Sequence, residues 1–178
     1  MRGGIFEILW QAIRGVVYIA LYILLISGTD FVLFNLGWCF IYLGFLLFLP
    51  IATPIVVQLL IGFLTGITMD LFFDTGGVHA GAAVLLMYLR PWVLRLLTPR
   101  DGYDSQDAVN IHQMGWQWMV VYLAMLTAIH HAAFFLLELG SFQVPGITLA
   151  KILISTLYTG LTLLIIQLMF FPTRRRSR

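Results

Sequence analysis

The chain has 178 residues, of which 61% are hydrophobic and only 10% are charged, and its formal net charge is +2. Soluble domains carry about a quarter charged residues, so this composition excludes an ordinary soluble domain and predicts an integral membrane protein whose outer surface faces the lipid bilayer. The mean hydropathy of +0.96 agrees with this prediction. The single cysteine, Cys39, excludes an internal disulfide and a multi-cysteine metal site.

The distribution of apolar residues predicts an all-α membrane protein, a six-transmembrane-helix bundle that forms one domain over residues 1–178. A span needs about 20 mostly apolar residues, and turn signals between the apolar runs set the bounds. The expected spans are residues 8–28, 31–49, 55–73, 79–97, 116–137 and 148–171.

The segment before the first span, residues 5–14, is amphipathic. Glu7, Gln11 and Arg14 share one helical face and apolar side chains occupy the other. The segment either lies in the headgroup region or continues into the first span as one long helix. A cleaved signal peptide is the competing interpretation, but no A-x-A site is evident, which favours an uncleaved anchor.

The connections between the spans are short, with one exception. Pro50 and Pro54 bracket a break before the third span, because proline ends helices. Glycines in residues 74–77 suit a tight turn before the fourth span. Residues 98–115 form the only long polar stretch, and residues 138–146 form the loop before the sixth span.

The basic residues predict the orientation, because cytoplasmic loops are enriched in lysine and arginine. With six spans and both termini cytoplasmic, nine of the ten basic residues lie at the cytoplasmic side and only Lys151 lies on the other. The five tryptophans all fall near predicted span ends, as interfacial tryptophans do.

The third span carries a row of residues at intervals of four, which places them on one helix face: Gln58, Gly62, Gly66 and Asp70. A Gly-x-x-x-Gly pair lets two helix backbones approach closely in lipid. The row therefore predicts either helix packing inside the bundle, against the small residues that open the fourth span, or docking of a partner's membrane helix. Asp70 lies four residues before the turn, so it either faces the bundle interior or binds the turn.

Three further polar residues fall inside predicted spans. Arg90 precedes Pro91 and lies deeper than Arg95, so we expect it to pair with a carboxylate or to bind a carbonyl that the proline frees. His130 and His131 point about 100° apart on a helix, so hydrogen bonds across the bundle are favoured over a metal site.

The catalytic motifs of common enzyme classes are not found. The sequence contains no P-loop, dinucleotide fingerprint, HExxH or G-x-S-x-G pattern. A dyad of Ser155 with Lys151 would be the basis of an intramembrane hydrolase, but no oxyanion donors accompany it. We predict no catalytic residue, no metal, no cofactor and no nucleic-acid partner.

The third and fourth spans resemble those of a known family. Gly66 is followed by Asp70-Leu71, then by Gly76-Gly77-Val78-His79-Ala80, and the fourth span reaches Tyr88-Leu89-Arg90. This pattern resembles the bacterial rod shape-determining protein MreD family over roughly a third of the chain. The turn Asp74-Thr75-Gly76-Gly77 replaces the more usual proline-containing turn.

The resemblance implies a function in the bacterial cytoplasmic (inner) membrane, where MreD-like proteins act without catalysis in the cell-elongation machinery. It implies an MreC-like partner, together with MreB and the wall-building glycosyltransferase and transpeptidase. The same six-helix architecture is similar to the membrane-embedded substrate-binding component of vitamin uptake transporters, which is the alternative function. Fold likeness alone does not establish transport.

Overall fold

The computed structural model describes residues 2–28, 32–33, 36–103, 108–139 and 145–171. The predicted turn at residues 29–30, the acidic residues at 104 and 107 and the basic cluster at residues 174–178 lie outside these ranges. Helices dominate the described part. The elements in chain order are α1 (Arg2–Gly28), β1 (Val32–Leu33), β2 (Gly37–Trp38), α2 (Leu43–Leu47), α3 (Ile55–Phe73), α4 (Val78–Leu96), α5 (Ile111–Met114), α6 (Trp116–Leu139) and α7 (Pro145–Phe170).

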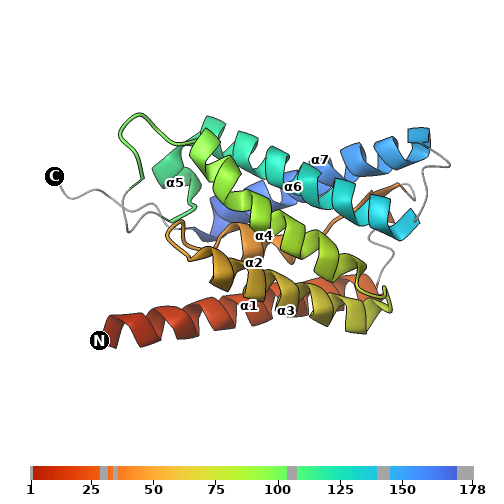
Figure 1. The fold of residues 1–178 in the computed structure, drawn as a ribbon, viewed down its shortest axis with the longest axis horizontal. Coiled ribbons are helices and arrows are strands. Elements are labelled where there is room, and N and C mark those ends of the chain that lie inside the picture. Colours follow the sequence, from red (N-terminus) through yellow and green to blue (C-terminus); the bar gives the residue numbers. More distant parts are fainter. Residues whose placement is uncertain (1, 29–31, 34–35, 104–107, 140–144, 172–178) are drawn as a thin grey trace.

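The long helices of the described part are α1, α3, α4, α6 and α7. They run roughly along the longest axis of the molecule (Figure 1). The turn after α3 makes α3 and α4 antiparallel neighbours, and α4 in turn packs against α6, which packs against α7. Figure 1 places the start of α1 and the end of α7 at the same end of the bundle. The segment 5–14 is part of α1, so it continues into the first long helix without a break.

The second predicted span is not a continuous helix, and this expectation was wrong. Residues 32–38 contain β1 and β2, which pair antiparallel with Val32 opposite Trp38, and α2 has only five residues. Figure 1 shows that the segment nevertheless runs between the two ends of the bundle. The broken segment is the stretch of residues 38–49. Every residue from Cys39 to Leu49 is buried, so this segment forms the centre of the core rather than its surface.

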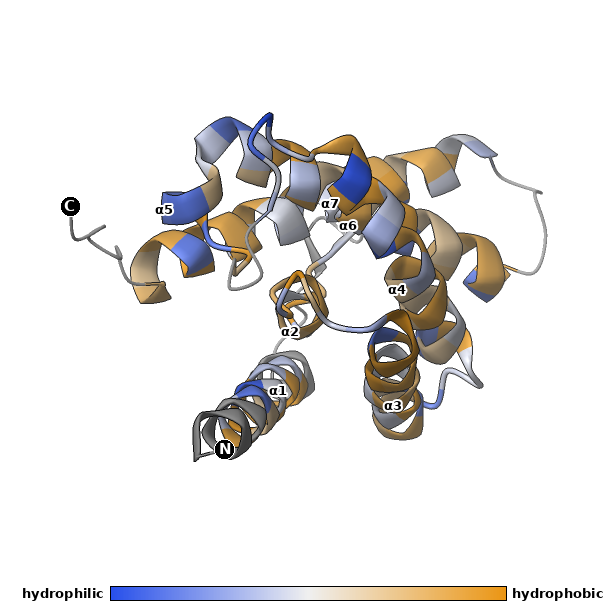
Figure 2. Cartoon of the chain, turned by 60° about the vertical axis from the view of Figure 1, so that its left-hand side comes forward, coloured by the Kyte–Doolittle hydropathy of each residue, from blue (hydrophilic) through white to orange (hydrophobic). Residues whose placement is uncertain are grey.

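The outer surface of the bundle is apolar, as lipid requires. Leucines 149, 153, 157 and 161 of α7 form a stripe at intervals of four and are each more than half exposed. Figure 2 shows hydrophobic colouring along most of the long helices. Among the described helices, α3, α6 and α7 are long and apolar enough to cross a membrane. These three candidate spans indicate a multi-pass membrane protein.

Helix α4 carries Arg90 and Arg95, which lower its mean hydropathy below that of α3, α6 and α7. In α1, the stretch Leu9–Leu24 is also apolar. The tryptophans at one end of the bundle are exposed: Trp10 of α1, Trp92 of α4 and Trp116 of α6. Exposed tryptophans at a common level are typical of a membrane interface.

Candidate functional site

The glycine row of α3 faces α4. A side chain added at Gly62 would place its Cβ 2.7 Å from Met87 Cγ and 3.0 Å from the carbonyl oxygen of Ala83. A Cβ at Gly66 would lie 2.7 Å from the backbone nitrogen of Ala80. The two backbones are therefore in contact along this row, which is the packing that glycine pairs allow in membranes.

Asp70, the last residue of the row, binds the start of α4. Its carboxylate accepts hydrogen bonds from the backbone N–H groups of His79 and Ala80, both at 2.9 Å, and from the Thr75 hydroxyl at 2.5 Å. The first N–H groups of a helix have no partner within the helix, and they favour a negative charge. Asp70 thus satisfies two of these donors across the turn, in which Gly76 and Gly77 adopt positive φ angles of 59° and 97°.

Replacement of this carboxylate gives the first testable prediction. An Asp70→Asn protein keeps the size of the side chain but loses the charge and one acceptor oxygen, so we expect a loss of about 1 kcal/mol in stability. Asp74→Asn is the matched control, because Asp74 is exposed with φ 52°, a conformation that asparagine tolerates. Thermal unfolding in detergent measures both variants. Equal melting temperatures for the two variants would contradict a capping function for Asp70.

The broken segment has backbone groups that no helix satisfies. Such groups are tolerated at membrane depth only where the surrounding protein binds them. The N–H of Trp38 donates to Ser155 Oγ at 2.9 Å, and the N–H of Phe40 donates to Thr159 Oγ1 at 3.1 Å. Cys39 Sγ lies 3.4 Å from the hydroxyl of Thr162. The hydroxyl face of α7 is therefore a binding surface for the start of the broken segment.

Arginines bind the other end of the broken segment. Arg90 is fully buried, and its guanidinium donates to the carbonyl oxygen of Leu49 at 2.5 Å, to Tyr122 Oη at 2.9 Å and to Gln58 Oε1 at 3.1 Å. Arg14 of α1 donates to the carbonyl of Phe48. Within the described residues, Arg90 pairs with no carboxylate, and the carbonyls that it binds are those of Leu47 and Leu49 rather than one that Pro91 frees, so neither expectation from the sequence is met. These two carbonyls lie where α2 ends and have no partner within that helix.

Two of the histidines bind the middle of the broken segment through one hydroxyl. Tyr42 Oη lies 2.9 Å from His79 Nδ1 and 2.9 Å from His130 Nε2, and all three side chains are buried. His130 Nδ1 has no partner among the described atoms. An unpaired lone pair costs less than an unpaired N–H, so the geometry favours His130 as donor to Tyr42 and Tyr42 as donor to His79.

This bridge gives the second prediction. A Tyr42→Phe protein keeps the ring but leaves the facing nitrogens of two buried histidines without a partner, and each buried unpaired group costs about 1–3 kcal/mol. We therefore expect a clear fall in the melting temperature. The same change at Tyr88, which is 53% exposed, should have little effect. A Tyr42→Phe protein as stable as Tyr88→Phe would show that the bridge does not stabilise the core.

His131 binds elsewhere than His130. Its Nδ1 lies 2.6 Å from the carbonyl oxygen of Thr127, so Nδ1 carries the proton, and Nε2 lies 3.2 Å from Thr159 Oγ1. His131 reaches the broken segment through its ring, which stacks on Phe40 with ring centres 5.1 Å apart. Within the described ranges, no group of three or more histidine, cysteine, aspartate or glutamate side chains is placed to hold a metal ion.

Ser155 and Lys151 contact different groups of the broken segment. The Ser155 hydroxyl is fully buried and accepts a backbone hydrogen bond from Trp38. Lys151 Nζ lies against aromatic rings, 4.8 Å from the ring centre of Trp38 and 5.7 Å from that of Phe135. Both side chains therefore stabilise the start of the broken segment, Ser155 through the backbone of Trp38 and Lys151 through the Trp38 ring.

Several residues of this polar core were missed by the sequence analysis. Tyr42 and Tyr122 look like ordinary apolar residues of their spans, and Gln167, which binds the backbone of Val109 and Ile111, lies among leucines. A signal was present in the hydroxyl residues of α7, since Ser155, Thr159 and Thr162 lie on roughly one face. Interhelical hydroxyls are common, however, and do not identify what they bind.

Comparison of the chain with protein-family models, with curated proteins and with solved structures finds no match. What the protein can do must therefore be inferred from its geometry. Its polar side chains converge on the protein's own backbone and on one another, which is an arrangement that fixes a conformation.

Proposed function

We propose that this protein is a non-enzymatic, multi-pass component of the bacterial cytoplasmic membrane that acts in the cell-elongation machinery and scaffolds wall synthesis with an MreC-like protein. One observation carries the proposal: the residues of the MreD-like pattern form one structural unit. Gly66 contacts the start of α4, Asp70 caps it, and Gly77 forms the turn between them. A sequence pattern whose residues contact one another supports a family resemblance better than the same residues without mutual contacts.

The polar core is consistent with a scaffold. A protein that presents a fixed surface to partners needs a single conformation, and satisfied buried polar networks specify one. Arg90, Tyr42 and Thr159 tie the broken segment to α4, α6 and α7. These contacts order the whole bundle around residues 38–49.

The proposed topology has six crossings with both termini in the cytoplasm. Five crossings are the long helices, and the sixth is the broken segment. Arg14, Arg90, Arg95 and Arg100 then lie toward the cytoplasmic side, in agreement with the enrichment of basic residues there.

Copurification is the experiment that tests the function. We expect the tagged protein, extracted from its native membrane in mild detergent, to recover an MreC-like protein with a single membrane helix, and its depletion to abolish rod shape. A matched extraction with an unrelated six-helix protein controls for nonspecific capture. Recovery of paired ATPases with a coupling subunit, without an MreC-like protein, would contradict the proposal.

A substrate-binding component of a vitamin-type uptake transporter is the second candidate. The broken segment favours it, because transporters build midplane sites from discontinuous membrane segments. In such sites the unwound carbonyls face a ligand, whereas here Arg90 and Tyr122 occupy the carbonyls of Leu47 and Leu49. Binding of small molecules to the purified protein with submicromolar affinity would support this second function.

A further inference from the structure

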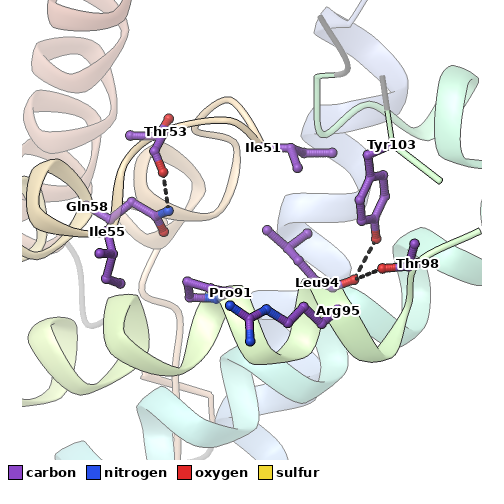
Figure 3. Close-up of a pocket in the computed structure, with 9 residues that line it drawn as sticks. All are labelled: Ile51, Thr53, Ile55, Gln58, Pro91, Leu94, Arg95, Thr98 and Tyr103. Carbon is purple, nitrogen blue, oxygen red and sulfur yellow. Dashed lines mark hydrogen bonds between the residues drawn. The ribbon is translucent and has the colours of Figure 1, made fainter. Parts of the chain in front are cut away.

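A cavity lies at the end of the bundle where the exposed tryptophans gather. Its volume is about 250 Å³, and Figure 3 shows its lining side chains, which come from the turn before α3, the start of α3, the end of α4 and the segment after it. The lining residues are Ile51, Thr53, Ile55, Gln58, Pro91, Leu94, Arg95, Thr98 and Tyr103. Most of this lining is apolar, and one residue, Arg95, is a cation.

We propose that this cavity binds the phosphate group of an anionic phospholipid, with Arg95 as the residue that contacts it. The occupant is a lipid of the leaflet at this end of the bundle, which is the cytoplasmic leaflet in the proposed topology. The proposal does not depend on the function in cell elongation.

Among the described residues that line the cavity, Arg95 is the donor that makes no hydrogen bond to the protein. Thr98 and Tyr103 both donate their hydroxyl protons to the carbonyl oxygen of Leu94, at 3.1 Å and 2.9 Å (Figure 3). Gln58 donates to the carbonyl of Thr53 and accepts from Arg90. The guanidinium of Arg95 stacks on Trp92, 5.3 Å from the ring centre, and stacking leaves its N–H groups available.

The charge around the cavity favours an anion. Arg90 lies directly behind Gln58, and Arg14 binds Phe48, next to the Leu49 carbonyl that Arg90 binds. In the part of the chain that the structure describes, none of these arginines or Arg95 forms an ion pair with a carboxylate. A phosphate group is the anion that the headgroup region supplies, and guanidinium binds it with charge-assisted hydrogen bonds.

The position of the cavity suits a lipid rather than a free ion. Trp92 is 60% exposed beside Arg95, which places this level at the headgroup region. Ile51, Ile55 and Leu94 supply apolar surface to the wall of the same cavity. A phospholipid can thus place its phosphate on Arg95 and its acyl chains along the exposed faces of α3 and α4.

Native mass spectrometry of the full chain in neutral detergent tests the proposal. We expect phosphatidylglycerol to bind more tightly than phosphatidylcholine, and Arg95→Gln to weaken phosphatidylglycerol binding about tenfold, the effect of losing a hydrogen bond to a charged group. Arg100→Gln, an exposed arginine beyond the end of α4, is the matched control and should bind as the unmodified protein does. Ile55→Phe, which fills part of the cavity without changing charge, should also weaken binding.

Three results would overturn the proposal. Equal losses for Arg95→Gln and Arg100→Gln would mean diffuse attraction by surface charge. If the single variants Ile55→Phe and Arg95→Gln both bind phosphatidylglycerol as tightly as the unmodified protein, the lipid lies outside the cavity. Competition by inorganic phosphate at the same concentration as the lipid would identify a site for a free anion instead.

Discussion

A Gly66→Ala protein should be less stable than the unmodified protein, although it adds only one methyl group. The new Cβ would lie 2.7 Å from Ala80 N and 2.7 Å from His79 O, and both are backbone atoms that cannot rotate away. Helices α3 and α4 must separate, which costs about 1–3 kcal/mol. The separation would also lengthen the hydrogen bonds of Asp70, because they cross the same contact.

The chain offers a matched control for this change. Gly160 lies inside α7, and a Cβ there would find its nearest neighbour, Thr127 Oγ1, at 4.0 Å. Gly160→Ala should therefore leave the melting temperature unchanged or raise it slightly, since alanine is the better helix former. Thermal unfolding and expression yield measure both variants. Equal effects of the two substitutions would refute close packing at Gly66.

An Arg90→Met protein should lose more stability than the Gly66→Ala protein. Methionine fills a similar volume but leaves the Leu49 carbonyl and the Gln58 amide oxygen without their donor in the core, at a cost of about 1–3 kcal/mol for each. Removing a buried charge offsets part of this loss. The net expectation is a low yield of folded protein, because the end of the broken segment has lost its hydrogen bonds to α4.

Two further substitutions distinguish the effect of the positive charge of Arg90 from the effect of its hydrogen bonds to the broken segment. Arg90→Lys keeps the charge but cannot reach several acceptors at once, so its melting temperature should lie between those of Arg90→Met and the unmodified protein. Arg95→Met, on the exposed face of the same helix, should be mild in neutral detergent. An Arg90→Met protein with the stability of Arg95→Met would show that the carbonyls at the end of α2 need no side-chain donor.

The long helices were predictable because their signal is local. Continuous apolar runs ended by Pro54 and by the glycine turn set α3, and the pattern around Gly66 and Asp70 identified a helix contact and a turn. The choice between internal packing and partner docking needed the structure, since only the arrangement in space shows that the glycine row faces α4.

The broken segment was not predictable from hydropathy. Residues 31–49 are as apolar as a membrane helix. The part from Cys39 to Leu49 is buried in protein, and burial there requires the same apolar side chains. The backbone groups that the missing helix would have paired are bound by partners far away in the chain: Ser155, Thr159, Tyr122 and Arg90. Taken singly, each partner is a residue type that is common in a membrane helix. Only the three-dimensional structure shows that all four bind the backbone of the same segment.

We expect residues 38–49 to cross the membrane without forming a membrane helix. The most direct test is labelling of single cysteines at positions 36 and 53, on either side of this segment, in a Cys39→Ser background. With a membrane-impermeant thiol reagent, Leu36→Cys should react in intact cells, and Thr53→Cys should react only in inside-out vesicles. Labelling of both positions from the same side would contradict the crossing and would make the segment a re-entrant loop.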